Sequence, residues 1–211
     1  DGKQFHSVPH RAGEVKVLRN LGYNAPAPIT SQYNWNNTIP YDHQITTAAM
    51  LSTNFRAYVL NGLGSGKTRA SLFAADFLIQ QGDIRKVLVV APLSTLTTTW
   101  EREIFTIMPY RSSVALHGTK AKRLSLLAGD FDFYIINTDG ITVIEDALME
   151  RGDIDLVIID ELAGFRNKRT NRWKAMNRVT KHRKYVWGMT GLPTPNGPTD
   201  AWAQAKLLTP E

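Results

Sequence analysis

The sequence contains no cysteine, which excludes disulfide bonds and metal sites built on thiolates. None of its apolar runs approaches the length of a membrane span, so we expect no membrane partner. The five histidines are scattered and show no metal-ligand spacing. The first residues hold neither a methionine nor an apolar signal region. We therefore expect a processed chain, or a piece of a longer one, that works in the cytoplasm.

Acidic residues are fewer than basic ones: 19 Asp and Glu stand against 25 Lys and Arg, which gives a formal net charge of +6. The excess is concentrated in residues 166–184, which hold nine basic residues and no acidic one. Such a run is either a solvated helix face or a surface for a phosphate backbone. Both interpretations stay open at this point.

The pattern of apolar residues divides the chain into an arm and one domain. Residues 1–38 are interpreted as an arm, because Asn24, Pro26 and Pro28 resist both helix and central strand. From residue 39 to residue 211, short apolar runs alternate with helix-length segments. This alternation predicts an α/β fold with a central, mainly parallel sheet and helices on both faces. The expected strands are 57–60, 87–90, 114–116, 134–136, 156–159 and 185–187, and the clearest helices are 69–80, 95–106 and 170–179.

A glycine-rich segment, residues 61–68, follows the first expected strand and precedes a helix. Glycines let the backbone curl so that N–H groups point inward, and the helix N-terminus favours bound phosphate. In this pattern Lys67 reaches the β- and γ-phosphates of a nucleotide, and Thr68 offers its hydroxyl to Mg²⁺. The usual first glycine is replaced by Asn61. The residues expected to contact the nucleotide here are Gly62, Gly64, Ser65, Gly66, Lys67, Thr68 and Arg69.

Two carboxylates, Asp160 and Glu161, follow the expected strand at 156–159. Ligands of such sheets bind at the carboxyl ends of the strands, where the glycine-rich segment also lies. We expect Asp160 to hold Mg²⁺ together with Thr68. We expect Glu161 to orient and deprotonate an attacking water as the general base, with Lys67 and Asp160 as its catalytic partners.

Several segments together resemble the first motor domain of superfamily-two helicases and translocases, in particular the Swi/Snf branch and the related helicase-like proteins of phages. The likeness covers about residues 39–211. Residues 40–44 resemble the Gln motif, in which Gln44 reads the adenine edge, and residues 189–193 resemble motif III, in which Thr190 and Gly191 couple nucleotide state to nucleic-acid grip. The positions that the resemblance places against nucleic acid are Pro92, Ser94 and Thr95 in motif Ia, Thr138, and Arg166 and Asn167 after the acidic pair.

The resemblance implies a three-layer RecA-like P-loop NTPase domain that uses ATP and Mg²⁺. DNA is the expected partner, with duplex favoured and single strands or RNA possible; a phage-encoded protein would work in the host cytoplasm. In the family a second RecA-like domain follows and supplies an arginine finger, worth roughly 10³-fold or more in rate. We therefore expect this chain alone to hydrolyse ATP slowly. Residues 162–164 depart from the family pattern because they contain no His.

Two other functions remain as alternatives. A module that binds nucleotide or nucleic acid without hydrolysis, and recruits partners, is favoured only by the missing His of residues 162–164. A small-molecule P-loop kinase would need an acceptor-binding lid, for which the sequence offers no candidate. The presence of Lys67, Thr68, Asp160 and Glu161 together favours the hydrolysing motor.

Overall fold

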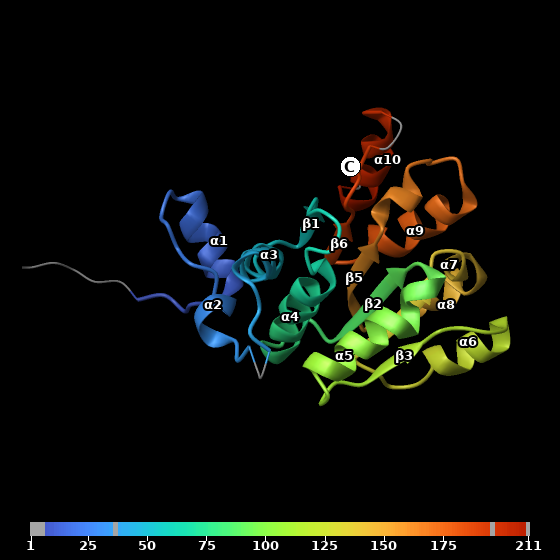
Figure 1. Cartoon of the computed structure of the whole chain (residues 1–211), viewed down its shortest axis with the longest axis horizontal. Coiled ribbons are helices and arrows are strands. Elements are labelled where there is room, and N and C mark those ends of the chain that lie inside the picture. The colour runs from blue at the N-terminus through green and yellow to red at the C-terminus, as the bar shows by residue number, and fades with distance from the viewer. Residues whose placement is uncertain (1–6, 36–37, 195–196, 210–211) are drawn as a thin grey trace, which may run out of the picture.

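A computed structural model describes residues 7–35, 38–194 and 197–209. Its centre is a six-stranded sheet in the order β1-β6-β5-β2-β4-β3, and each neighbouring pair is parallel (Figure 1). The α/β prediction and its six strands are therefore confirmed. The strands are β1 (Arg56–Val59), β2 (Lys86–Ala91), β3 (Ser113–Ala115), β4 (Phe133–Asn137), β5 (Ile154–Asp160) and β6 (Tyr185–Met189).

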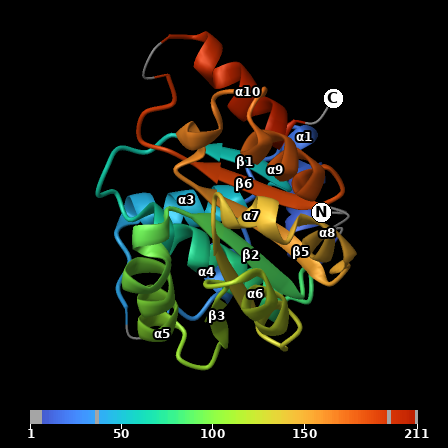
Figure 2. The same ribbon diagram turned by 90° about the vertical axis from the view of Figure 1, so that its right-hand side faces the viewer.

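Helices cover both faces of the sheet, which gives the expected three layers (Figure 2). One layer contains α3 (Asp42–Ser52), α4 (Lys67–Gln80) and α5 (Arg102–Ile107). The other contains α6 (Lys120–Leu127), α7 (Gly140–Val143), α8 (Glu145–Glu150), α9 (Asn171–Lys181) and α10 (Thr199–Leu208). Within the described residues, no helix has the length and apolar character needed to cross a membrane.

The strands are apolar almost throughout because both of their faces are buried. In β2, Val87 and Val89 pack on the side of α3 and α4, whereas Leu88 and Val90 pack on the side of α9. Strand side chains alternate between faces, so a run of four apolar residues supplies two residues to each core. This burial explains why continuous apolar runs marked the strands correctly.

The helical stretch expected at 95–106 is present, but it is not α-helical from its start. It opens with a 3₁₀ turn, η1 (Leu93–Thr95), continues as a π-helical turn, η2 (Leu96–Glu101), and becomes α-helical only in α5. π-helical turns are rare and occur frequently at functional sites. This turn carries Trp100, whose ring is fully buried in the core on the face of the sheet that α3, α4 and α5 cover.

The arm contributes α1 (Ala12–Asn20) and α2 (Ile29–Gln32), and its last described part packs onto the domain. Tyr33 is buried among aromatic rings, with Phe73 and Phe77 of α4 at 6.1 Å between ring centroids. The Tyr33 hydroxyl donates to Oδ2 of Asp76 at 2.7 Å. Asp76 is fully buried on α4 and also accepts from Arg111 Nε at 2.7 Å, so it joins the arm to the core.

We predict that Tyr33→Phe destabilises the domain, because it removes one hydrogen bond to a buried carboxylate while keeping the ring. The expected loss in free energy of unfolding is about 2 kcal/mol, the usual worth of a bond to a charged group. Tyr23→Phe is the matched control, since Tyr23 belongs to the same arm and is exposed. Urea denaturation measures both variants, and equal stabilities would show that the arm is not anchored through Asp76.

Candidate functional site

The candidate site lies where three adjacent strands end. β6 runs between β1 and β5, so the segment after each of these strands emerges at the same edge of the sheet. A cleft of about 460 Å³ opens there. Its lining joins α3, the glycine-rich loop, the π-helical turn and the acidic pair: Gln44, Leu63, Gly64, Gly66, Lys67, Thr68, Arg69, Thr99, Glu103, Asp160 and Glu161.

The glycine-rich loop between β1 and α4 has the conformation that its sequence predicted. Gly64 and Gly66 adopt the left-handed region, with φ of 72° and 69°. A Cβ on Gly66 would lie 1.9 Å from Nε2 of Gln44, so a side chain at this position would have to push the end of Gln44 aside. The first turn of α4 holds no acidic residue, which leaves the positive end of its dipole unopposed.

The donors around this loop fit a phosphate group and a divalent cation. Nζ of Lys67 donates to the carbonyl oxygens of Asn61 at 2.9 Å and Gly62 at 2.8 Å, so the ammonium bends back over the loop. Oγ of Ser65 is buried and has no hydrogen-bond partner among the described residues, as expected for a group that serves a ligand. Thr68 and Asp160 offer the oxygen ligands that Mg²⁺ prefers, and both line the cleft.

Glu161 has the one backbone outlier among the described non-glycine residues, with φ of 54°. The left-handed region costs a residue with a Cβ about 1–2 kcal/mol, and such strain concentrates at functional sites. Oε1 of Glu161 accepts from the hydroxyl of Thr190 at 2.8 Å. Thr190 is fully buried at the end of β6, and its N–H donates to the carbonyl of Val59 on β1 at 3.1 Å. Thr190 therefore touches both neighbouring strands.

Asp160 is held by Trp100, to which the sequence analysis gave no role at the site. Its Oδ2 accepts from the indole Nε1 of Trp100 at 3.0 Å. The pKa of the Asp160 carboxyl is raised, chiefly because the group is buried, and the negative charge of Glu161 raises it further. The hydrogen bond from Trp100 and the positive charge of Lys67 act in the opposite direction and lower this pKa. A buried indole N–H needs an acceptor, and this rule was the available signal that Trp100 would meet a polar partner.

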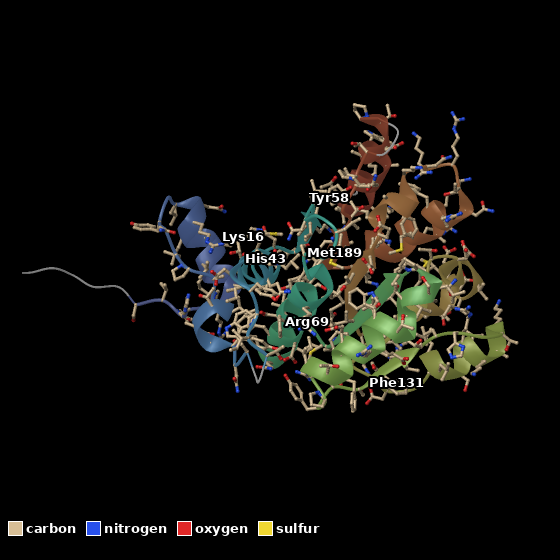
Figure 3. All side chains as sticks on the ribbon, in the orientation of Figure 1. Lys16, His43, Tyr58, Arg69, Phe131 and Met189 are labelled. Carbon is tan, nitrogen blue, oxygen red and sulfur yellow. The ribbon has the colours of Figure 1, made fainter. Side chains whose placement is uncertain are left out.

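The opposite wall of the loop is formed by the start of α3. Gln44 is buried, and its Oε1 accepts from the N–H of Tyr41 at 3.1 Å. The ring of His43 stacks on the ring of Tyr41, and its Nε2 lies 2.9 Å from the carbonyl oxygen of Ser65. Tyr41, His43 and Gly62 line an open hollow of about 720 Å³ beside the loop. His43 can be located in Figure 3 at the start of α3, and sequence reasoning did not assign it a role.

Arg69, expected to contact the nucleotide, is bound to a neighbouring helix. Its Nε donates to Oε2 of Glu103 at 2.6 Å across the cleft wall, and Figure 3 labels its position on α4. Both side chains still line the cleft. Arg69 thus joins α4 to the helical stretch that carries Trp100.

The residues expected against nucleic acid follow three strands that are neighbours in the sheet. β5, β2 and β4 are adjacent, so the segments after them lie along one half of the same edge. Pro92, Ser94 and Thr95 follow β2, Thr138 follows β4, and Arg166 and Asn167 follow η3 (Leu162–Phe165) after β5. Ser94, Arg166 and Asn167 are exposed. The candidate cleft thus lies after β1, β6 and β5, and this second row of residues follows β5, β2 and β4 along the same edge.

A parallel sheet covered on both faces, with a glycine-rich loop leading into α4, defines a RecA-like P-loop domain. The chain is similar to protein p41 of Acyrthosiphon pisum secondary endosymbiont phage 1, with 30% identity over 175 residues, 79% of this chain and 38% of that protein. It is also similar to the chromatin-remodeling ATPase INO80 of Gibberella zeae, with 28% identity over 160 residues, 70% of this chain and 8% of INO80.

Among solved structures, the Sulfolobus solfataricus SWI2/SNF2 ATPase core in complex with dsDNA superposes with a TM-score of 0.72 at 22% identity, over 82% of this chain and 36% of that one. The chain thus spans less than two fifths of the length of each of these three proteins. The SNF2-related domain family matches residues 43–211. The chain belongs to this family, and the resemblance to the Swi/Snf branch is confirmed.

We predict that Gly66→Ala prevents nucleotide binding, because the new methyl group displaces Gln44 from under the loop. Gly82→Ala is the matched control: Gly82 has a similar φ of 76°, but a Cβ there meets nothing within 4 Å. Both variants should lose stability by about 1–2 kcal/mol from backbone strain alone. Calorimetric titration with ADP separates them, and equal affinities would contradict the role given to the close contact with Gln44.

Proposed function

We propose that the chain is the ATP-binding half of a DNA-dependent ATPase motor that couples hydrolysis to movement on DNA. The observation that carries this proposal is the joint lining of one cleft by the phosphate loop and by Asp160 and Glu161. Membership of the SNF2-related domain family supports ATP as the nucleotide, because relatives in the family are named as ATPases and helicases. Strand separation rather than duplex translocation is the second choice.

In this proposal the phosphate loop, the acidic pair and Gln44 have separate tasks. The loop and Lys67 bind the phosphates, and Thr68 and Asp160 hold Mg²⁺, which neutralises charge on the phosphates. Glu161 orients the attacking water and accepts its proton. Thr190 donates to Glu161, so the strand end that carries Gly191 responds to the state of the base. Gln44, below the loop, is proposed to read the adenine edge.

Duplex DNA is the proposed track. The similar Sulfolobus solfataricus core is described in complex with dsDNA. In this chain, Arg166 and Arg169 line an open groove of about 860 Å³ together with Trp202, whose ring lies 4.5 Å from the ammonium of Lys168. A cationic groove at the carboxyl edge suits a phosphate backbone.

A second RecA-like domain is proposed to form the other wall of the cleft. The curated relatives are much longer than this chain, which leaves room for such a domain in them. It would supply the arginine finger, so the chain alone would bind nucleotide weakly and turn it over slowly.

The direct test is ATP turnover by the motor that contains this chain, with duplex DNA, single-stranded DNA or RNA. We predict stimulation by duplex DNA and its abolition by Lys67→Ala. Lys120→Ala is the control, because Lys120 also begins a helix but lies away from the cleft. Normal turnover in Lys67→Ala would refute the site, and stimulation by single strands alone would favour strand separation.

Glu161→Gln separates hydrolysis from binding. The amide keeps the size of the side chain but cannot accept the proton of the attacking water, so turnover should fall by at least about 10²-fold. ATP affinity should stay within about twofold of the original. If the unsubstituted motor bound ATP without any turnover under all conditions, the chain would instead be a binding module that recruits partners.

Arg166→Ala should weaken binding of duplex DNA of any sequence and lower the slope of log affinity against log salt by about 1, because it removes one phosphate contact. Lys181→Ala is the control: Lys181 ends α9, at the amino edge of the sheet, and is exposed as well. Fluorescence anisotropy at several salt concentrations measures both. An unchanged slope in Arg166→Ala would remove this residue from the DNA surface.

A further inference from the structure

The ring of Trp100 is completely buried in the core that the sheet shares with α3, α4 and α5, yet its polar edge reaches the candidate site. Its Nε1 donates to Oδ2 of Asp160 at 3.0 Å, across 60 residues of sequence. An indole has one N–H and no acceptor, so this bond uses all of its polar capacity. The bond joins the π-helical turn η2 directly to the end of β5.

The helical stretch is fixed directly after Trp100, by Glu101 at the end of the π-helical turn and by Glu103 in α5. Oε1 of Glu101 accepts from the N–H of Ala115 on β3 at 3.0 Å, and Glu103 binds Arg69 of α4. The ring therefore has a defined position before any ligand binds. The charges of two cleft residues, Glu161 and Lys67, also act on the carboxylate of Asp160.

We infer that Trp100 is a positioning residue for the divalent cation: by holding Oδ2 of Asp160, its indole N–H sets the orientation in which the carboxylate meets Mg²⁺. This inference rests on the proposed function, because it assigns Asp160 to the cation. Groups that hold a metal ligand from behind orient it and tune its affinity, and their loss typically lowers metal affinity by 10–100-fold. Trp100 holds Asp160, the proposed metal ligand, in the same way.

The chain offers a matched control in Trp187 on β6. Trp187 is also completely buried, and its Nε1 donates at 3.0 Å to the carbonyl oxygen of Asn54, away from the acidic pair. Replacement of either tryptophan by phenylalanine removes one N–H and part of one ring from the same core. Any difference between the two variants in cation binding therefore reports the acceptor and not the burial.

The experiment is calorimetric titration of ADP into Trp100→Phe, Trp187→Phe and the unsubstituted chain, in EDTA and over a series of Mg²⁺ concentrations. In EDTA, the ADP affinity of all three should agree within about twofold. Mg²⁺ is expected to change the ADP affinity. In Trp100→Phe, the Mg²⁺ concentration at which half of this change in ADP affinity is reached should rise by about tenfold. In Trp187→Phe it should not change.

The outcomes separate this inference from the proposed function. If the unsubstituted chain binds no ADP, the proposed function and this inference both fail. If it binds ADP with a Mg²⁺ effect that Trp100→Phe leaves unchanged, or that both variants weaken equally, only the inference is overturned.

A measurement on the unsubstituted chain covers the case in which Trp100→Phe does not fold. The NMR signal of the Trp100 indole N–H should shift when Mg²⁺ is added to the ADP complex, because its acceptor becomes a metal ligand. The signal of the Trp187 indole should stay in place. If the NMR signal of the Trp100 indole N–H does not shift when Mg²⁺ is added, the inference is overturned.

Discussion

The position of β6 between β1 and β5 is the constraint on which the candidate site depends. β1 leads into the phosphate loop, β5 ends in the acidic pair, and β6 ends at Thr190 between them. The hydroxyl of Thr190 donates to Glu161 and its N–H donates to Val59, so one residue is hydrogen-bonded to the ends of both neighbouring strands. Because the strands are buried on both faces and paired in parallel register, these strand ends cannot move independently.

A second constraint comes from the irregular helix after β2. Its π-helical turn carries Trp100 to Asp160, while Glu101 and Glu103 attach the same stretch to β3 and α4. Thr95, expected to contact nucleic acid, lies at the start of this stretch. The two halves of the carboxyl edge, one proposed to bind nucleotide and the other proposed to face DNA, are therefore joined by short covalent and hydrogen-bonded paths.

The sequence was sufficient to predict a feature of the structure wherever one short segment contains all the residues that the feature needs. A buried parallel strand needs a continuous apolar run, so all six strands could be predicted within a few residues of their ends. The loop at 61–68 needs glycine at particular places, and Gly64 and Gly66 indeed have positive φ. The role of Trp100 and the contact of His43 with the loop escaped prediction, because their partners lie far away or on another element.

By itself, the sequence determined the fold class, the phosphate loop and the family likeness, since each is written in residues that are close together along the chain. Only the tertiary structure decided which strand ends are neighbours, and so which side chains meet Asp160 and Glu161. It also decided that Glu161 takes a left-handed backbone and that Arg69 binds Glu103. Strand order and side-chain pairing depend on packing between distant segments, and a pattern of apolar residues does not encode the neighbour of each strand.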